Sequence, residues 1–501
     1  MATTLEILSY VVALLVALYY YFTAKFNFWR DRSVPGPKPI PVFGNIFWPM
    51  IGKQPLAEFL TNLYREYKNE PLVGIFVRRT PYLVVQDPDF IKDVLIKDFP
   101  TFANRGFLLN EVAEPLSQHL FSLEAKRWRP LRSQLSPVFT SGKLKGIFTL
   151  ILDCAEHLES HLGKLVNKAQ PIEVRELAAM YTTDVIGSCV FGIEMKSLSD
   201  EESEFRRMGR EIFATHWKAL LKFRMKECAS TLYDLLGYVL PADEVNEFFR
   251  KITIETLTYR KEHNIVRPDF MNTLLELRNN PERVKDIKLN DTLLAAQAYV
   301  FFAAGFETSS TTIANALYEL ALNEEVQKKL REEIKVFDQK TDGQWRYETI
   351  KEMTYLDKVF KETLRKYPPL AFLFRETTND YTFQSTKVSL PKGSRVWIPI
   401  FSIQRDPDIY PDPEKFDPER FSEEAVKARN PMHYLPFGDG PRNCIGARFA
   451  IYQTKIGLIR ILRNYQVQVC ETTPIPYVLE PVAFILCPKE RLYLKIVKNE
   501  I

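Results

Sequence analysis

A ten-residue segment near the C-terminus limits how the chain around it can fold. The segment Phe437–Gly446 reads FGDGPRNCIG, and Gly438, Gly440 and Pro441 all precede the single cysteine, Cys444. Glycine and proline this close together do not suit a helix or a strand, but they let the backbone turn sharply and approach a flat group closely. Apolar residues at helical spacing resume after the cysteine, so the sequence predicts a helix that begins just after Cys444.

A cysteine at such a position is suited to bind a metal. The unpaired N–H groups and the dipole at a helix N-terminus favour the thiolate, and thiolate is the form that ligates metal ions. Arg442 could pair with an anionic group nearby. A Cys-x-Gly turn taken alone is nevertheless most often structural. The other five cysteines lie far apart without a Cys-x-x-Cys pair, so we expect small buried side chains rather than zinc ligands or disulfides: Cys154, Cys189, Cys228, Cys470 and Cys487.

The whole segment resembles the haem-binding loop of cytochrome P450 enzymes, Phe-x-x-Gly-x-x-x-Cys-x-Gly, and matches it at every fixed position. The resemblance covers nearly the whole chain and is greatest to animal microsomal members, insect ones above all. It implies a haem b cofactor with Cys444 as the axial thiolate. It also implies that Phe437 packs on the sulfur side and that Arg442 contacts a haem propionate.

The remaining pattern predicts a mainly α-helical body with a minor β region, which agrees with the cytochrome P450 fold. Helical periodicity dominates from residue 89 to 336, and the longest candidate helix is Asn290–Leu322. Strands are expected at Leu72–Val77 and Tyr82–Gln86, with short ones at Phe383–Ile398 and near the C-terminus. No alternating βα pattern occurs, which argues against a doubly wound sheet. The net charge of +4 gives no support for a nucleic-acid partner.

The N-terminus reads as a membrane anchor. Ile7–Ala24 is an uncharged run of 18 residues, which as a helix would span about 27 Å, close to the hydrocarbon thickness of a bilayer. Tyr19–Tyr21 suit the membrane interface, and basic residues follow the run but do not precede it, so we expect the body on the cytosolic side. A cleaved signal peptide is the alternative, but it usually has a basic start and a shorter apolar region.

The expected division of the chain follows from this pattern. Residues 1–25 are a signal-anchor transmembrane helix, 26–44 a basic and proline-rich hinge, and 45–501 a haem-thiolate catalytic domain. Prolines at every second position from Pro35 to Pro41 forbid helix and predict a stiff, extended spacer. The segment Trp217–Met225 mixes apolar and basic side chains, which predicts a second contact with the membrane.

Glu362 and Arg365 have the spacing of a helical ion pair, as do Glu204 and Arg207, so the spacing alone is a weak signal. The position of the first pair resembles the family's Glu-x-x-Arg helix, with Arg420 as the partner arginine. The resemblance implies a structural role, in which two arginines share one buried carboxylate and hold the cysteine loop.

The stretch from Ala304 to Ser309 lies midway in the long candidate helix. Glu307 and Thr308 could be ordinary polar residues on a solvated face. The stretch matches the family's pattern, however, which implies that Ala304 lies beside the haem and that Glu307 and Thr308 relay protons to bound dioxygen. A local opening of the helix would make room for dioxygen.

Further residues are expected at the haem propionates by the same resemblance. Trp128 and Arg132 have the family's Trp-x-x-x-Arg spacing, and Arg105 and Arg375 look like two more propionate partners; surface arginine is the alternative reading. The basic residues around Trp128, which are Lys126, Arg127 and Arg129, are expected to dock an acidic reductase, although charge runs are usually only solvated.

The resemblance implies insertion of one oxygen atom from O₂ into a lipophilic small molecule. The substrates would be xenobiotics, such as plant toxins or insecticides, or endogenous lipids or hormones. Electrons would come from NADPH through a separate NADPH–cytochrome P450 reductase, with cytochrome b5 as a second candidate donor, at the endoplasmic reticulum membrane. Two alternatives stay open: a haem-thiolate isomerase or dehydratase that does not use O₂, and a non-catalytic haem-binding protein.

Candidate pocket segments do not identify the substrate, because most of their residues are simply apolar or aromatic. These segments are Phe107–Leu120, Phe301–Ala304, Leu370–Phe374 and Val482–Leu486.

Overall fold

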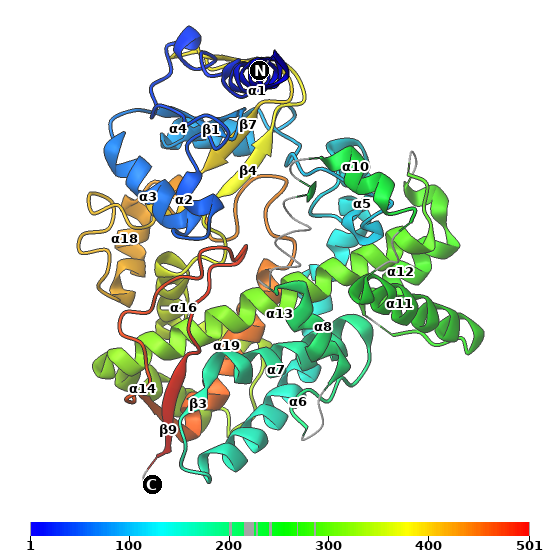
Figure 1. The fold of residues 1–501 in the computed structure, drawn as a ribbon. Coiled ribbons are helices and arrows are strands. Elements are labelled where there is room, and N and C mark those ends of the chain that lie inside the picture. Colours follow the sequence, from blue (N-terminus) through cyan, green and yellow to red (C-terminus); the bar gives the residue numbers. More distant parts are fainter. Residues whose placement is uncertain are drawn as a thin grey trace. The chain divides into compact units, whose positions relative to one another are not determined.

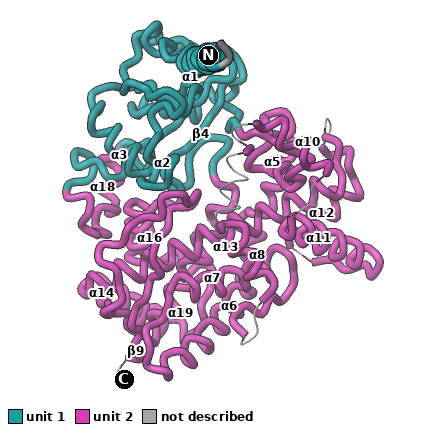
Figure 2. The backbone as a smooth tube through the Cα atoms, viewed as in Figure 1, with its two compact units in different colours: residues 1–106, 370–411, 430–443 teal, residues 107–369, 412–429, 444–501 magenta. Residues whose placement is uncertain are grey.

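The computed structural model describes residues 2–199, 203–214, 225–226, 229–239, 243–267, 269–284 and 287–499. Its helices outweigh its small sheets, so the expected mainly α-helical class is confirmed (Figure 1). The chain forms two compact units, coloured separately in Figure 2: unit 1 is residues 1–106, 370–411 and 430–443, and unit 2 is the rest. The predicted membrane contact at Trp217–Met225 falls almost wholly outside the described residues.

Unit 1 is built on a four-stranded sheet in the order β1-β2-β7-β4. Strand β1 is antiparallel to β2, and Val77 faces Thr80 across a two-residue turn in which Arg78 has a φ of 59°. The turn is shorter than expected, so β2 begins two residues before Tyr82. Strand β2 then pairs in parallel with β7. The elements of unit 1 are α1 Ala2–Thr23, α2 Phe47–Met50, α3 Leu56–Glu66, β1 Leu72–Val77, β2 Thr80–Val85, α4 Pro88–Lys92, β4 Leu373–Glu376, β5 Tyr381–Thr382, β6 Ser389–Leu390, β7 Arg395–Ile398 and α17 Ile400–Ile403.

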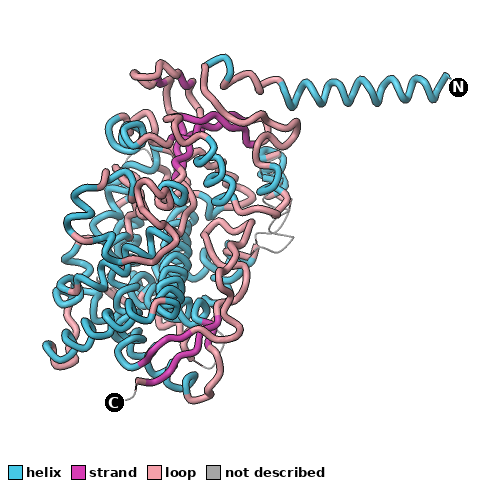
Figure 3. Tube along the Cα trace, turned by 90° about the vertical axis from the view of Figure 1, so that its left-hand side faces the viewer, coloured by secondary structure: helices cyan, strands magenta, loops and turns pink. Residues whose placement is uncertain are grey.

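Helix α1 is mostly apolar, and its side chains from Thr4 to Tyr21 are exposed. Among the described residues it is the one helix long and apolar enough to cross a membrane, with a mean hydropathy of 1.8 over Thr4–Thr23. Figure 3 shows α1 extending away from the rest of unit 1. At its C-terminal end the Arg79 guanidinium lies 3.8 Å from the centre of the Tyr21 ring, a cation–π contact.

The segment that follows α1 is packed against β1. Trp29 is 4% exposed, and its indole Nε1 donates a hydrogen bond to the Ile75 carbonyl at 3.0 Å. The ring fills the space beside Gly74, where a Cβ would come within 2.3 Å of Trp29 Cγ. Gly36 approaches the Gly74 carbonyl so closely that a Cβ there would lie 1.9 Å from the oxygen. The predicted hinge, residues 26–44, is therefore attached to β1 by the Trp29 side chain and by the close approach of Gly36 to Gly74.

Unit 2 is organised around α13, the longest helix, which runs through the middle of this unit in Figure 1. It spans Asp291–Leu322, and the Asn290 side chain caps it by accepting a hydrogen bond from Leu293 N at 2.7 Å. The expected helix Asn290–Leu322 is thus confirmed. Helices α7, α11, α16 and α19 pack against it, and β3, β9 and β8 form a small sheet. The other elements of unit 2 are α5 Ala125–Leu135, α6 Ser141–Val166, β3 Ile172–Glu173, α7 Val174–Ile186, α8 Glu204–Ile212, α10 Ser230–Leu236, α11 Glu244–Glu262, α12 Phe270–Asn279, α14 Glu324–Lys340, α15 Tyr347–Glu352, α16 Thr354–Lys366, α18 Glu423–Ala428, α19 Ala447–Asn464, β8 Tyr465–Gln468 and β9 Tyr493–Lys498.

Trp29→Ala should weaken β1 locally, because it empties a buried site that Gly74 cannot fill. We expect a loss of about 3–5 kcal/mol in the free energy of local opening, the usual range for Trp→Ala in a core. Hydrogen exchange of the β1 amides in detergent-solubilised protein measures this energy. Trp48, which is 51% exposed, provides the control: Trp48→Ala should leave β1 protection unchanged. Equal protection of β1 in both variants would mean that Trp29 does not hold the segment.

Candidate functional site

Cys444 lies in unit 2, two residues before Gly446, the N-cap of α19. The expected helix just after Cys444 is confirmed, since α19 begins at Ala447. The Cys444 side chain is exposed, whereas most of α19 beyond its first turn is buried. A thiolate at Cys444 would raise the pKa of Arg132, but burial has the larger effect and lowers that pKa overall. The charge of Arg132 is therefore within electrostatic reach of the sulfur.

The turn before Cys444 belongs to unit 1 and needs its glycines. Gly438 and Gly440 have φ angles of 66° and 71°, a region that residues with a Cβ rarely adopt. A Cβ on Gly440 would lie 1.9 Å from the Leu95 carbonyl oxygen. Arg442 in this turn is 2% exposed, and its carbonyl accepts a hydrogen bond from Arg105 Nη2 at 3.0 Å. Two of the predicted propionate partners are thus brought together; Phe437 lies in the same turn.

Arg375, on β4 of unit 1, is a buried cation. It is 2% exposed, and burial lowers its pKa to about 10. Its guanidinium donates to the Phe374 carbonyl at 2.9 Å, its Nε makes no hydrogen bond, and none of the described carboxylates pairs with it. Burial removes water from this guanidinium, and no described carboxylate replaces it. A carboxylate of a bound cofactor, such as a haem propionate, would provide the missing charged partner.

Ala304 and Thr308 lie one turn apart on the same side of α13. Both are accessible, although Ala303, Phe306 and Ser309 around them are buried. The Thr308 hydroxyl donates to the Ala304 carbonyl at 2.7 Å, the back-bonding typical of threonine inside helices. The helix is continuous here, so the expected local opening is not seen. Gly305 has a packing role instead, since a Cβ there would lie 2.3 Å from Ile186 Cδ1 of α7.

Glu307 has a partner, Arg175, that the sequence did not indicate. Its carboxylate forms an ion pair with the Arg175 guanidinium of α7, and the two side chains are 6% and 32% exposed. Burial is the largest single effect and lowers the pKa of Arg175, but the ion pair with Glu307 together with the nearby Cys487 and Glu173 raises that pKa overall. No spacing rule could have found Arg175, because 132 residues separate it from Glu307.

The cluster predicted at Glu362 is assembled in unit 2. Glu362 and Arg365 are both 0% exposed and share two hydrogen bonds of 2.7 and 2.8 Å. Burial raises the pKa of Glu362 despite the opposing effect of Arg365. Arg420 Nε lies 3.5 Å from the same carboxylate, an ion-pair distance without hydrogen-bond geometry. The carboxylate also accepts from Asp417 N at 2.9 Å, so the cluster holds the segment around residue 417.

The basic residues around Trp128 are only partly available for docking. Trp128 is 4% exposed on α5, and Lys126 and Arg129 are exposed. Arg127 is instead neutralised by Glu111 and Glu124, at 2.9 and 2.7 Å. The expected three-residue patch is thus reduced to Lys126 and Arg129.

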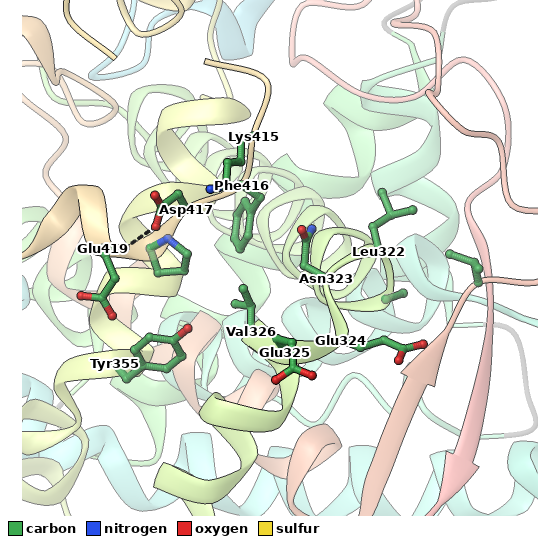
Figure 4. A pocket seen from close by; sticks show the side chains of 13 residues that line it. Leu322, Asn323, Glu324, Glu325, Val326, Tyr355, Lys415, Phe416, Asp417 and Glu419 are labelled. Atoms are coloured by element: carbon green, nitrogen blue, oxygen red, sulfur yellow. Dashed lines mark hydrogen bonds between the residues drawn. The ribbon is translucent and has the colours of Figure 1, made fainter. Parts of the chain in front are cut away.

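A cavity of about 580 Å³ lies at the junction of α13 and α14 in unit 2 (Figure 4). Tyr355 and Phe416 contribute aromatic walls, and Glu324, Glu325 and Asp417 contribute acidic ones. None of the predicted catalytic or haem-binding residues lines it.

Glu362→Ala or Arg365→Ala should yield little haem-loaded protein. Removing one partner leaves an uncompensated buried charge, at a cost of about 3–5 kcal/mol. Glu204→Ala is the matched control, because Glu204 and Arg207 are 3.8 Å apart and exposed; it should be nearly silent. Haem content per protein, measured from the Soret absorbance, distinguishes the two. Equal haem content in all variants would show that the buried pair is dispensable.

Comparison with known proteins places the chain in a family. Residues 34–496 match the sequence model described as Cytochrome P450. The chain is 41% identical to the probable cytochrome P450 6a14 of Drosophila melanogaster, over 97% of this chain and 98% of that protein. Cytochrome P450 6A1 of Musca domestica is also 41% identical, over 98% and 97%. Cytochrome P450 6k1 of Blattella germanica is 37% identical, over 99% and 97%. The chain therefore belongs to the cytochrome P450 family, as a monooxygenase that binds haem through a cysteine thiolate.

Proposed function

We propose that Cys444 is the haem ligand and that the protein oxidises lipophilic small molecules with O₂ and electrons from NADPH. The accessible thiol of Cys444 at the start of α19 carries this assignment. Cys154, Cys189 and Cys487 are buried, and burial raises their thiol pKa values, that of Cys154 to about 12. Burial would raise the pKa of Cys470, but hydrogen bonds with Thr472 and Thr473 lower it overall; Cys470 does not lie in the glycine-rich turn, where Cys444 matches the family's haem-binding pattern. Among the described cysteines, Cys444 is thus the best thiolate ligand.

The haem propionates would be bound by the arginines described above and by Trp128. Arg105, Arg375 and Arg442 are the candidates in unit 1, and Trp128 and Arg132 in unit 2. Arg375 supports this role most strongly, because its buried charge has no carboxylate partner. When bound, the haem iron supplies the binding and activation of dioxygen, and the protein controls ligand, access and protons.

Glu307 and Thr308 would supply protons beside Ala304. Arg175, which is partly exposed, holds the Glu307 carboxylate near a route to solvent. The Thr308 hydroxyl donates a hydrogen bond to the Ala304 carbonyl and can turn to a stronger acceptor when one is present. A carboxylate and a hydroxyl on successive residues can then pass a proton along α13 to the accessible face of Ala304.

The cellular setting follows from α1 and the residues after it. We propose residues 1–25 as an endoplasmic reticulum anchor, 26–44 as a connecting segment and 45–501 as a cytosolic catalytic domain. The exposed α1 and the basic residues that follow it support this orientation. Xenobiotics such as plant toxins or insecticides are the proposed substrates, with endogenous lipids or hormones as alternatives. Lys126 and Arg129 would contact the reductase, and cytochrome b5 remains a second candidate donor.

Reductase-supported NADPH consumption tests this function against its alternatives. With purified reductase and a lipophilic compound, a monooxygenase consumes NADPH and O₂ together and forms a hydroxylated product. An isomerase or dehydratase would turn over its substrate without either reagent. A non-catalytic haem-binding protein would form no product under any of these conditions.

Cys444→Ser should abolish the thiolate-ligated absorption spectrum of the reduced carbon-monoxide complex, because hydroxyl is a poor replacement for thiolate on iron. Cys470→Ser is the matched control and should keep that spectrum. Survival of the spectrum in the Cys444 variant would refute the ligand assignment.

Thr308→Ala should uncouple the enzyme rather than unfold it. Haem loading should stay near the native level, since the hydroxyl bonds only within its own helix, while NADPH is diverted to hydrogen peroxide. Product formed per NADPH is the quantity to measure. An unchanged ratio would argue against proton relay at this residue.

Arg375→Met should weaken haem binding without lowering the stability of the apoprotein. Removing this buried cation should not destabilise the apoprotein, because in the absence of haem no carboxylate offsets the cost of burying its charge. Haem transfer to apomyoglobin should be faster in the variant, and thermal unfolding of the apoprotein should not be earlier. Unchanged haem transfer would exclude Arg375 as a propionate partner.

A further inference from the structure

The cavity at the junction of α13 and α14 has an apolar lining that is partly open to solvent. Apolar side chains reach it from four segments of unit 2: Leu322 at the end of α13, Val326 on α14, Phe416 and Pro418 before α18, and Val469 after β8. Leu322 and Val469 are 37% and 39% exposed. The volume of about 580 Å³ lies within the range of small-molecule sites.

One wall of the cavity is held in place by Gln327. This side chain is 1% exposed, and its Nε2 donates to the carbonyls of Leu320 and Val467, both at 2.9 Å. Its Oε1 accepts from Val467 N at 2.9 Å. Leu320 belongs to α13, Gln327 to α14 and Val467 to β8, so one buried amide joins three elements around the cavity.

A second wall is held by the Glu362 cluster. The Glu362 carboxylate accepts from Asp417 N at 2.9 Å, and Arg365 Nη2 donates to the Pro413 carbonyl at 2.8 Å. These contacts fix the backbone of the segment that brings Phe416 and Asp417 into the lining (Figure 4). Because buried polar groups hold both walls, a ligand would meet a preformed site.

The lining carries more negative charge than the chain itself neutralises. Glu324 and Glu325, in the first turn of α14, form no ion pair with a described residue, and neither does Asp417. Among the described residues that line the cavity, Lys415 is the one cation. Acidic residues at a helix N-terminus also suit the helix dipole, so Glu324 and Glu325 alone would not indicate a site.

An ammonium group already binds at the edge of the cavity. Lys329 Nζ lies 4.3 Å from the centre of the Tyr355 ring and 2.7 Å from the Glu419 carboxylate, and both of these partners line the cavity. Burial, and then the charges of Glu419 and Asp417, raise the pKa of Tyr355 to about 12. An aromatic ring beside carboxylates is the environment that organic cations prefer.

We propose that this cavity binds an organic cation, with its ammonium group among the carboxylates of Glu324, Glu325 and Asp417. Its hydrocarbon or aromatic body would pack against Leu322, Phe416 and the neighbouring apolar side chains. None of the predicted catalytic or haem-binding residues lines the cavity. Binding there therefore goes beyond the proposed function and requires neither oxygen nor electrons.

The probe that tests this proposal is (2-naphthylmethyl)trimethylammonium, because a quaternary ammonium has no lone pair and cannot ligate iron. Isothermal titration calorimetry measures its affinity for the full-length, haem-loaded protein in detergent, with excess 1-tritylimidazole to occupy the iron. The uncharged isostere 2-neopentylnaphthalene, in which carbon replaces nitrogen, should bind about tenfold more weakly, because it offers the carboxylates no charge.

The double variant Glu324→Gln/Glu325→Gln removes two charges at exposed positions and nearly preserves side-chain size. It should weaken binding of the cation about tenfold, the effect of losing two partly exposed ion pairs. Glu332→Gln is the matched control, since Glu332 is exposed on the same helix, two turns beyond Glu325, and does not line the cavity. The control should change the affinity by less than about twofold.

Amide hydrogen exchange locates the bound probe. The cation should slow exchange in residues 323–326 and 415–419, which line the cavity, and should leave residues 304–308 of α13 unchanged. No binding of the cation, equal binding of its uncharged isostere, or native affinity in the double variant would overturn the proposal. Protection confined to residues 304–308 would also overturn it, because the probe would then lie beside Thr308.

Discussion

Unit 2 depends on the burial of its longest helix, α13, which is packed on nearly every side. Helix α13 carries polar side chains into the core, and each must find a partner there. Gln297 binds the backbone of the segment 107–124, Glu307 binds Arg175 of α7, and Glu319 binds Lys366 of α16 at 2.8 Å. Because these partners come from distant parts of the chain, pairing the buried polar groups of α13 brings together segments that are far apart in the sequence.

The exception to this burial is the face of Ala304 and Thr308. Thr308 satisfies its hydroxyl within its own helix, so it needs no partner from another segment. A helix face that stays accessible while its flanks are packed is suited to small molecules rather than to protein contacts. In the proposed function, the same helix provides both the rigid support and the reactive surface, and the segment 107–124 is attached to it two turns away, at Gln297.

The sequence was a good guide wherever the signal is local. The bounds of α13 and the start of α19 follow from periodicity, and the tight turn before Cys444 follows from its glycines and proline. Long-range partners were not predictable. Nothing in the sequence near Glu307 indicates Arg175, and the neutralisation of Arg127 by Glu111 depends on how the segment 107–124 folds back on α5.

Resemblance to the family distinguished a structural ion pair from a surface ion pair, which the local sequence pattern could not do. The spacing of Glu362 and Arg365 is no better than that of Glu204 and Arg207, yet the first pair is fully buried and the second exposed. Burial is a property of the whole fold, so only a match to the family's order of motifs separated the two pairs in advance. The chemical roles given to Cys444, Thr308 and the arginines remain predictions of the same kind.

The role proposed for every other residue of the site depends on the sulfur of Cys444 ligating the haem iron. X-ray absorption at the iron edge of full-length protein with selenocysteine in place of Cys444 tests this bond directly. If Cys444 is the ligand, selenium replaces sulfur in the first coordination shell of the iron. A shell that still contains sulfur, with no selenium, would show that another residue ligates the iron.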